Sequence, residues 1–268
     1  MSSLLPAPTP RSRAVVTGAS SGIGAALAGA LARRGHHLVL VARREERLKD
    51  LGARLAATYR VEAEARACDL ADRSQRSALA GELADRDIAV LCNNAGFATY
   101  GPLSSADPAR ERLQAELNAV AVLDLTLAVL PGMLARKAGG ILITGSTAGN
   151  QPGPLNATYA AGKAFANTFA ESLHAELAGT GVGCTLLAPG PVRTEFAEVA
   201  EVSRLDRLLP GPLWVSADRA AELAVDGLAR GKRRVVPGAF AKAQTLGGQY
   251  GPRGLAGPLL RAVYRKAK

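Results

Sequence analysis

A tyrosine and a lysine four residues apart, Tyr159 and Lys163, form the first pair of side chains in this sequence whose spacing could support chemistry. Residues four apart on a helix share one face, so the Lys163 ammonium would lie beside the Tyr159 phenol. A permanent positive charge there would favour the phenolate and lower the tyrosine pKa from about 10 toward neutrality. We therefore expect Tyr159 to be a general acid and base. Because such pairs are also common on ordinary helix surfaces, the accompanying residues decide this interpretation.

A serine and an asparagine could join the pair. Ser146 lies two residues after the end of the apolar strand expected at 140–144, and the helix that carries Tyr159 is expected from about residue 156 to 178. A hydroxyl at the end of a strand can donate a hydrogen bond to an oxygen that gains negative charge. Asn118 lies within a helix expected from about 107 to 137, where asparagine is a poor helix former, and this position suggests a functional role.

A glycine-rich segment near the start of the chain predicts nucleotide binding. A short β run at 14–16 leads into the sequence TGASSGIG at 17–24 and then into a segment of helical composition. Small residues let the backbone approach a pyrophosphate, and the helix N-terminus offers free N–H groups and the positive end of its dipole. The spacing is Gly-x-x-x-Gly-x-Gly, and a structural turn is the alternative. The candidate cofactor contacts here are Gly18, Ser20, Ser21, Gly22, Ile23 and Gly24.

Two arginines follow the second expected strand and bear on the choice of cofactor. In a nucleotide-binding sheet of this kind, the segment after that strand lies beside the adenosine ribose. An acidic residue there would accept from the 2′-hydroxyl of NAD, whereas this strand runs into Arg43 and Arg44. Arginine matches a 2′-phosphate, so NADP(H) is favoured over NAD(H). The alternative is that both arginines merely solvate the next helix, and Glu45 and Glu46 weaken the electrostatic argument.

Strands and helices alternate along the chain, which predicts an α/β fold. Apolar strand runs in such an alternation indicate a parallel sheet covered by helices on both faces. We expect a Rossmann-type doubly wound parallel sheet of about seven strands in a single domain over residues 13–240. The Asn93–Gly96 turn follows a strand and so lies at the carboxyl edge, where such sheets bind ligands. Expected strands lie at 14–16, 37–41, 61–67, 88–92, 140–144, 182–187 and 233–236.

The two ends of the chain differ in composition from this domain. Residues 1–12 are rich in Pro, Ser and Thr and are expected to be a disordered leader. Ten of the 33 basic residues follow Gly227 with no acidic residue among them, so residues 1–226 carry 23 basic and 23 acidic side chains. The net charge of +10 therefore belongs to the C-terminal part. The end of the extension 241–268, at residues 259–266, could form a short basic amphipathic helix on an anionic membrane or a neighbouring subunit, or simply be solvated.

Composition argues against several other classes of protein. Nucleic-acid binding is not expected, since the domain is neutral. Cys68, Cys92 and Cys184 lack the spacing of a disulfide framework or a zinc site, so no metal is expected. No apolar run approaches the roughly 20 residues that span a bilayer, and the N-terminus lacks the order of a signal peptide. These features predict a cytoplasmic protein.

Together the motifs resemble the short-chain dehydrogenase/reductase family in its classical, single-domain form. The resemblance covers about residues 13–238, with the motifs in the family's order and approximate spacing. Extended members have a different glycine spacing and a larger second domain, and this chain matches neither feature. The matching positions are Thr17 to Gly24, Asp69, Asn93 to Gly96, Asn118, Ser146, Tyr159, Lys163, Pro189, Gly190 and Thr194.

The resemblance implies a role for each of these positions. Asn118, Ser146, Tyr159 and Lys163 would be the catalytic residues, with Asn118 completing a proton relay to Lys163 through water. Lys163 and Tyr159 would also meet the cofactor. Other implied contacts are Asp69 and Leu70 with the adenine, Asn94, Ala95 and Gly96 with the adenine ribose side, Arg43 with the 2′-phosphate, and Val192 and Thr194, beyond Pro189 and Gly190, with the nicotinamide carboxamide.

The resemblance also implies hydride transfer between a ketone or aldehyde and an alcohol, with a homodimer or homotetramer as the assembly. A mobile flap over 195–215 would help to bind the substrate, and the aliphatic character of the cleft suits a lipophilic one. Two alternatives stay open, a catalytically silent NADP(H)-binding regulator or scaffold and a peripheral membrane reductase attached by its basic tail. The candidate substrate contacts are Ser146, Tyr100, Leu103, Gln151, Leu155 and Trp214.

Overall fold

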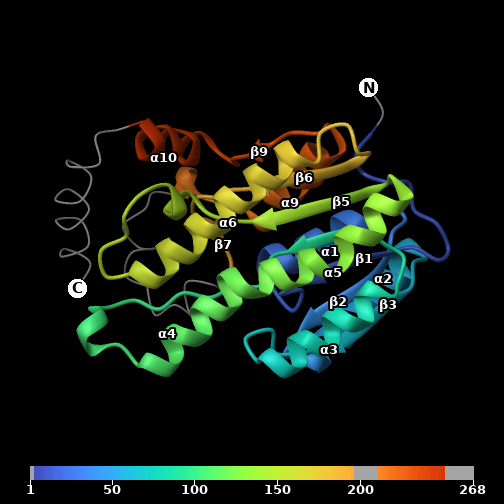
Figure 1. Ribbon diagram of the computed structural model, residues 1–268, viewed down its shortest axis with the longest axis horizontal. Helices are drawn as coiled ribbons and strands as arrows, with labels where there is room; N and C mark the ends of the chain where they lie inside the picture. Colours follow the sequence, from blue (N-terminus) through green and yellow to red (C-terminus); the bar gives the residue numbers. More distant parts are fainter. Residues whose placement is uncertain (1–2, 196–210, 251–268) are drawn as a thin grey trace.

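The protein is described by a computed structural model for residues 3–195 and 211–250, and a seven-stranded parallel sheet forms its centre (Figure 1). The strand order is β3-β2-β1-β4-β5-β6-β9, which confirms the doubly wound sheet expected from the sequence. A separate parallel pair joins β7 (Val192–Arg193) to β8 (Val215–Ser216). The main strands are β1 (Arg13–Thr17), β2 (His37–Ala42), β3 (Ala63–Ala67), β4 (Ile88–Asn93), β5 (Gly139–Thr144), β6 (Val182–Leu187) and β9 (Arg234–Val235).

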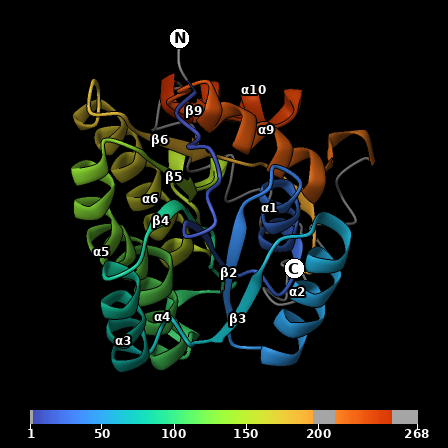
Figure 2. The same ribbon diagram turned by 90° about the vertical axis from the view of Figure 1, so that its right-hand side faces the viewer.

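Helices cover both faces of the sheet, and Figure 2 shows the two layers on either side of it. One layer contains α1 (Gly22–Ala32), α2 (Glu45–Tyr59) and α9 (Ala217–Ala229). The other contains α3 (Arg73–Ala84), α4 (Pro108–Ala115), α5 (Ala121–Arg136) and α6 (Ala157–Glu176). Short 3-10 turns lie at η1 (Leu103–Ser105), η3 (Thr147–Asn150) and η4 (Gly211–Leu213).

Alternation along the strands explains why the sheet is buried on both sides. In β1, Ala14 and Val16 pack into the α1–α2–α9 layer, while Val15 packs into the α3–α6 layer. Successive strand residues point to opposite faces, so a strand that is apolar at every position can bury both faces. The polar residues at the carboxyl ends of the strands are thereby left at one edge of the sheet.

The helix expected from 107 to 137 is divided by a π-helical turn, η2 (Glu116–Val120), between α4 and α5. By length and hydropathy alone, the continuous helix Pro108–Arg136 could cross a membrane, contrary to the expectation that no apolar segment reaches that length. Leu125, Val129 and Met133 of this helix are buried against the sheet. One side of the helix thus packs on the sheet, and 39% of its most apolar 18-residue window is buried.

The N-terminal segment differs from the disordered leader that we expected. Within residues 3–12, the Leu4 N–H donates to Ala229 O at 3.0 Å, and Leu5 packs on the α1–α2–α9 layer. A Cβ at Gly183 would lie 3.0 Å from Leu4 Cβ, so the glycine leaves the space that Leu4 fills. The Pro and Ser content of this segment suggested disorder, whereas Leu4 and Leu5 attach it to the domain.

The C-terminal extension begins as a helix that contacts the domain. The helix α10 (Ala239–Tyr250) spans the boundary expected at residue 240 and packs against η3. Thr147 and Gln244 share a hydrogen bond of 3.2 Å at this contact. Most of the expected flap (196–210) and the basic amphipathic segment (251–268) lie outside the described residues.

Candidate active site

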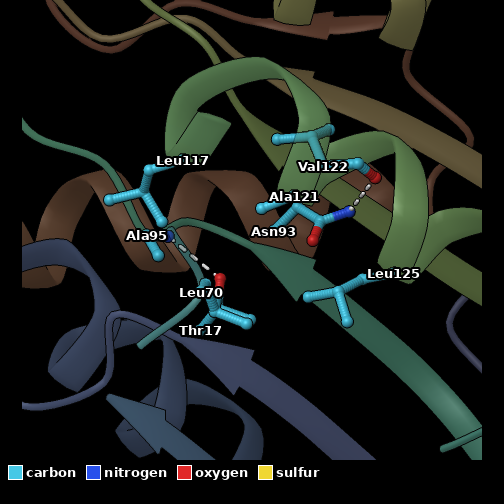
Figure 3. A pocket seen from close by; sticks show the side chains of 8 residues that line it. All are labelled: Thr17, Leu70, Asn93, Ala95, Leu117, Ala121, Val122 and Leu125. Carbon is cyan, nitrogen blue, oxygen red and sulfur yellow. Dashed lines mark hydrogen bonds between the residues drawn. The ribbon is translucent and has the colours of Figure 1, made fainter. Parts of the chain in front are cut away.

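The carboxyl ends of β1 and β4 are joined by the side chain of Thr17. Its Oγ1 accepts from the N–H groups of Asn94 and Ala95, both at 2.9 Å, and donates to Cys92 O at 3.2 Å. Figure 3 shows Thr17 and Ala95 beside Leu70, where a narrow pocket opens against α5. The strand order reverses between β1 and β4, which is the place where open parallel sheets bind ligands. The predicted adenine-side residues Leu70 and Ala95 therefore meet at this edge.

The glycine loop follows a backbone path that side chains would obstruct. Gly18 has a φ of 67°, and a Cβ there would lie 2.9 Å from Ala95 Cα. A Cβ at Gly24 would lie 2.1 Å from Gly18 O, so the first turn of α1 packs directly on the loop. The N-cap residue Ser21 makes no capping bond with its side chain. The first N–H groups of α1 are thus available to an anion.

Arg44 lies on the loop, together with a second arginine and a glutamate that the sequence analysis did not single out. Its guanidinium donates to Ser20 Oγ at 3.0 Å and to Ser21 Oγ at 2.9 Å. Arg44 and Arg47 both pair with Glu195, at 3.0 and 2.9 Å. These ion pairs and hydrogen bonds hold the pKa of the Glu195 carboxyl below its usual range. The arrangement is an anion site in which a protein carboxylate is the counter-ion.

Asn118 lies in the π-helical turn and faces Gly96. Its Nδ2 donates to Phe97 O at 2.9 Å, whereas its buried Oδ1 has no hydrogen-bond partner among the described residues. A Cβ at Gly96 would lie 2.6 Å from Asn118 Oδ1 and 3.4 Å from Lys163 Nζ, so both polar atoms surround this glycine. A π-turn shifts the register of a helix and is frequent at functional sites. The turn here carries the predicted Asn118 to the predicted Lys163.

Lys163 lies on α6, and its buried side chain reaches the end of β5. The residue is only 5% exposed, and its Nζ donates to Thr144 O at 2.8 Å. Burial lowers the pKa of Lys163 from 10.5 to about 8. The sequence analysis did not foresee this lowered pKa, because it depends on how deeply the fold buries the side chain. A cation of this kind can release and regain a proton near physiological pH.

Tyr159 lies one helical turn before Lys163 on α6, as the spacing predicts. The Lys163 Nζ is 5.8 Å from the centre of the Tyr159 ring. Tyr159 is half-buried. The structure thus places the predicted pair together.

Ser146 follows β5 and starts the 3-10 turn η3. Its Oγ accepts from the Ala148 N–H at 3.1 Å, so the hydroxyl proton can be directed to another acceptor. A Cβ at Gly149 would lie 2.5 Å from the Lys163 carbonyl, so η3 packs directly on α6. Ser146 and Lys163 are therefore held at the same strand end.

The remaining predicted cofactor residues lie around the same edge. Pro189 O accepts from the Thr147 N–H at 3.0 Å, next to Ser146. A Cβ at Gly22 would lie 3.0 Å from Thr194 Cγ2, so Thr194 reaches the glycine loop. Gly190 contacts α10, and Val192 lies in β7. The Asp69 carboxylate accepts from the Ala71 N–H. Ile23 lies in the first turn of α1, and Arg43 is exposed after β2.

The candidate substrate residues come from two sides of the site. The Gly101 N–H donates to Leu155 O at 2.8 Å, which joins the segment after Tyr100 to the loop before α6. Trp214 directly precedes β8, which pairs with β7, and the N–H of the next residue, Val215, donates to Pro191 O at 3.2 Å. Gln151 ends η3, and Leu103 is 63% exposed in η1. The candidate substrate residues therefore lie in the loop after β4, around η3 and directly before β8.

The residues present fit a dinucleotide cofactor. The glycine cradle leaves the α1 N-terminus open, the Arg44 cluster provides a second anion site near the end of β2, and Asn118 Oδ1 is a buried acceptor that lacks a partner. Among the described residues, no group of three His, Cys, Asp or Glu side chains could hold a metal ion. The polar groups of the site are therefore of the kind that bind phosphates and hydroxyls.

Comparison with known proteins identifies the family. The model of the short chain dehydrogenase family matches residues 12–203. The chain belongs to the short-chain dehydrogenase family. The structure of a short-chain dehydrogenase from Sphingobium yanoikuyae in complex with NADPH is similar, with a TM-score of 0.80 and 33% identity, covering 91% of this chain and 95% of that one.

Two curated relatives show how far the similarity extends. A very-long-chain 3-oxoacyl-CoA reductase of Laccaria bicolor is 40% identical over 168 residues, which are 61% of this chain. The chain spans only 50% of the length of that protein. Sulfoacetaldehyde reductase 2 of Chromohalobacter salexigens is 35% identical over 216 residues, which are 78% of this chain and 85% of that protein.

Proposed function

We propose that this chain is an NADP(H)-dependent oxidoreductase that interconverts a ketone or aldehyde and an alcohol. The observation that carries the proposal is the position of Lys163, which is buried between Thr144 O, the Tyr159 ring and the Asn118–Gly96 contact. Burying an ammonium is costly, so a site that retains one uses it. The names of the relatives, which are reductases of carbonyl compounds, agree with this reaction.

When bound, the cofactor supplies or accepts the hydride at the carbonyl carbon. In the reduction, the substrate oxygen gains negative charge, and the Ser146 hydroxyl can donate to it because Oγ only accepts in its bond with the Ala148 N–H, which leaves the hydroxyl proton unused. The Tyr159 phenol donates to the same oxygen and finally delivers the proton. In the oxidation, Tyr159 removes the proton from the alcohol.

Lys163 and Asn118 maintain the protonation of Tyr159. The ammonium near the phenol stabilises the phenolate, and its lowered pKa lets it pass a proton to that group at neutral pH. The unpartnered Asn118 Oδ1 can hold a water molecule, through which the lysine is reprotonated from solvent. Its position beside Gly96 and Lys163 Nζ supports this path.

The preference for NADP(H) is supported by the cluster around Arg44. Its bonds to Ser20 and Ser21 lie at the start of α1, and Arg47 adds a second cation. A 2′-phosphate would replace the Glu195 carboxylate between the two arginines. Lipophilic substrates are supported by the apolar candidate residues Leu155 and Trp214.

Replacing Tyr159 with Phe tests the reaction. Turnover of NADPH with a panel of cyclohexanone, acetophenone, decanal and a 3-oxodecanoyl thioester should fall at least ~100-fold, because the proton donor is lost. The dissociation constant for NADPH, followed by its fluorescence, should change less than about threefold. Binding of NADPH without turnover in the wild-type protein would instead support the silent regulator or scaffold.

Replacing Arg44 with Ala tests the choice of cofactor. The dissociation constant for NADPH should rise about 10- to 100-fold, whereas that for NADH should change little, because only NADPH carries the 2′-phosphate. Glu195→Gln is the matched variant and should tighten NADPH more than NADH. Equal losses of both cofactors on Arg44→Ala would refute the phosphate contact.

A further inference from the structure

The segment that carries Ser146 is held by a side chain outside the predicted site. Asn167 lies on α6, and its Oδ1 accepts from the Ser146 N–H at 3.2 Å while its Nδ2 donates to Ser146 O at 2.9 Å. Nδ2 also donates to Asn150 Oδ1 at 3.1 Å, at the other end of η3. One carboxamide thus binds both backbone groups of the serine.

Beyond the end of β5, these bonds take the place of the backbone hydrogen bonds that a neighbouring strand would make. The Gly145 N–H still donates to Leu187 O of β6 at 2.8 Å, but Ser146 lies beyond the paired strand. Its backbone is extended, with φ −167° and ψ 156°. Asn167 therefore acts as one further strand residue and holds Ser146 in the direction of the strand.

We call the two hydrogen bonds between the Asn167 carboxamide and the Ser146 backbone the clamp, and this clamp is buried. Asn167 is only 3% exposed, and a Cβ at Gly145 would lie 2.0 Å from its Oδ1. The glycine before the serine is thus the residue that lets the carboxamide approach. Leaving either backbone group of Ser146 buried without a partner would be costly, so the clamp has few alternatives.

Asn167 also lies on the same face of α6 as the predicted catalytic residues of that helix. Tyr159, Lys163 and Asn167 are spaced by four residues along α6, so all three lie along one face. Lys163 Nζ binds Thr144 O, and Asn167 binds Ser146 two residues later. The same helix therefore fixes the phenol, the ammonium and the backbone of the serine relative to one another.

We infer that Asn167 is a positioning residue for Ser146, which holds the serine hydroxyl where it can donate to the substrate oxygen. The inference rests on the proposed role of Ser146 in carbonyl reduction. It assigns to Asn167 no contact with substrate or cofactor.

A double-mutant cycle on turnover tests the inference, using NADPH and the carbonyl compound of the panel above that the wild-type protein reduces fastest. Ser146→Ala and Asn167→Ala should each lower kcat about 10- to 100-fold, with an unchanged dissociation constant for NADPH. Combining them should cause little further loss, because Asn167 acts through Ser146. Losses that multiply in the double variant would overturn the inference.

A pH profile of Asn167→Asp gives a second, independent readout. A carboxylate can still accept from the Ser146 N–H but repels Ser146 O, whereas a protonated carboxyl restores both bonds. Burial should raise the pKa of the new carboxyl group, so kcat relative to wild type should recover several-fold as the pH falls from 8 to about 5.5. A ratio that stays constant with pH would contradict the clamp.

Leu173→Ala controls for general destabilisation of α6, because Leu173 is buried on the same helix and packs in the core. The melting temperature of Leu173→Ala should fall as much as that of Asn167→Ala. Its kcat should nevertheless stay within about threefold of the wild-type value. An equal loss of kcat in the control would assign the effect of Asn167 to stability. Full activity of Ser146→Ala would defeat the proposed role of the serine itself, whereas loss in Ser146→Ala with full activity in Asn167→Ala would defeat only the inference.

Discussion

Lys163 shows how the site trades stability for chemistry at the scale of one residue. The ammonium has a backbone partner in Thr144 O, yet burial still lowers its pKa from 10.5 to about 8. The folded protein therefore disfavours the charged form relative to the unfolded chain. The lysine can exchange protons near neutral pH for the same reason that it costs stability.

Replacing Lys163 with Met should abolish turnover but stabilise the cofactor-free protein at pH 7. A pKa lowered from 10.5 to about 8 corresponds to a cost of about 3 kcal/mol below pH 8. Because the folded pKa lies below the unfolded one, wild-type stability rises as the pH increases from 8 to 10.5. The advantage of the variant, followed by urea unfolding, should therefore shrink over that range. An advantage that is the same at pH 7 and pH 10 would contradict the assigned cause.

The residue types of the site could be predicted from sequence, but their supports could not. Tyr159 and Lys163 follow from helical spacing alone, and the structure places them 5.8 Å apart, ring centre to Nζ. Asn167 has the same spacing, yet nothing in the sequence shows that Gly145 leaves space for it. Glu195 was likewise hidden, because its contact with Arg44 joins residues 151 positions apart.

At the scale of elements, the π-helical turn η2 is fixed by a buried arginine on the neighbouring helix. Arg76 of α3 has a side chain only 2% exposed and pairs with Glu116 at 2.9 Å and with Asp124 at 2.7 Å. Its third contact is Leu70 O at 2.9 Å. Arg76 thus joins the predicted adenine-side residue Leu70 to the first residue of the turn that carries Asn118 and to the first turn of α5. The sequence predicted one continuous helix, but these ion pairs depend on tertiary packing that the sequence pattern does not show.

Replacing Arg76 with Met should lower the free energy of unfolding by about 3 kcal/mol, because two carboxylates lose their buried partner. The value lies at the low end for buried pairs, since Glu116 and Asp124 are 42% and 35% exposed. Arg86 offers a matched control, as it pairs with Glu64 and Glu82 but is 26% exposed. Arg86→Met should cost less than about 1 kcal/mol in the same urea titration. Equal costs would mean that burial does not set the strength of the Arg76 pairs.

At the scale of the whole molecule, the two helical layers explain why the fold was predictable and its edges were not. Continuous apolar strands require cover on both faces, so the order of elements determined the doubly wound sheet. The N-terminal segment was not expected to be ordered, because its contacts are with distant residues: Leu4 packs on the strand glycines Gly140 and Gly183, and Leu5 packs on the α1–α2–α9 layer. Polar composition indicates disorder only where no such surface is available.

The connection between α1 and β2 contains a buried histidine that should set the acid stability of the whole protein. His36 is only 1% exposed, and its Nε2 has no hydrogen-bond partner among the described residues. Burial, reinforced by Arg34 and His37, lowers the pKa of His36 from 6.5 to about 4. The neutral form is therefore the one that the folded protein accepts.

Stability contributed by this low pKa is present above pH 6.5 and is lost as the pH falls toward 4, because the unfolded chain binds a proton first. The difference between 6.5 and about 4 corresponds to a loss of about 3 kcal/mol. His36→Leu removes this proton uptake, so relative to wild type it should gain about 2 to 3 kcal/mol between pH 7 and pH 4. Urea unfolding at several pH values measures the gain, with His37→Leu as the control at a partly exposed neighbour. If both variants follow the same pH dependence as wild type, another group controls acid unfolding.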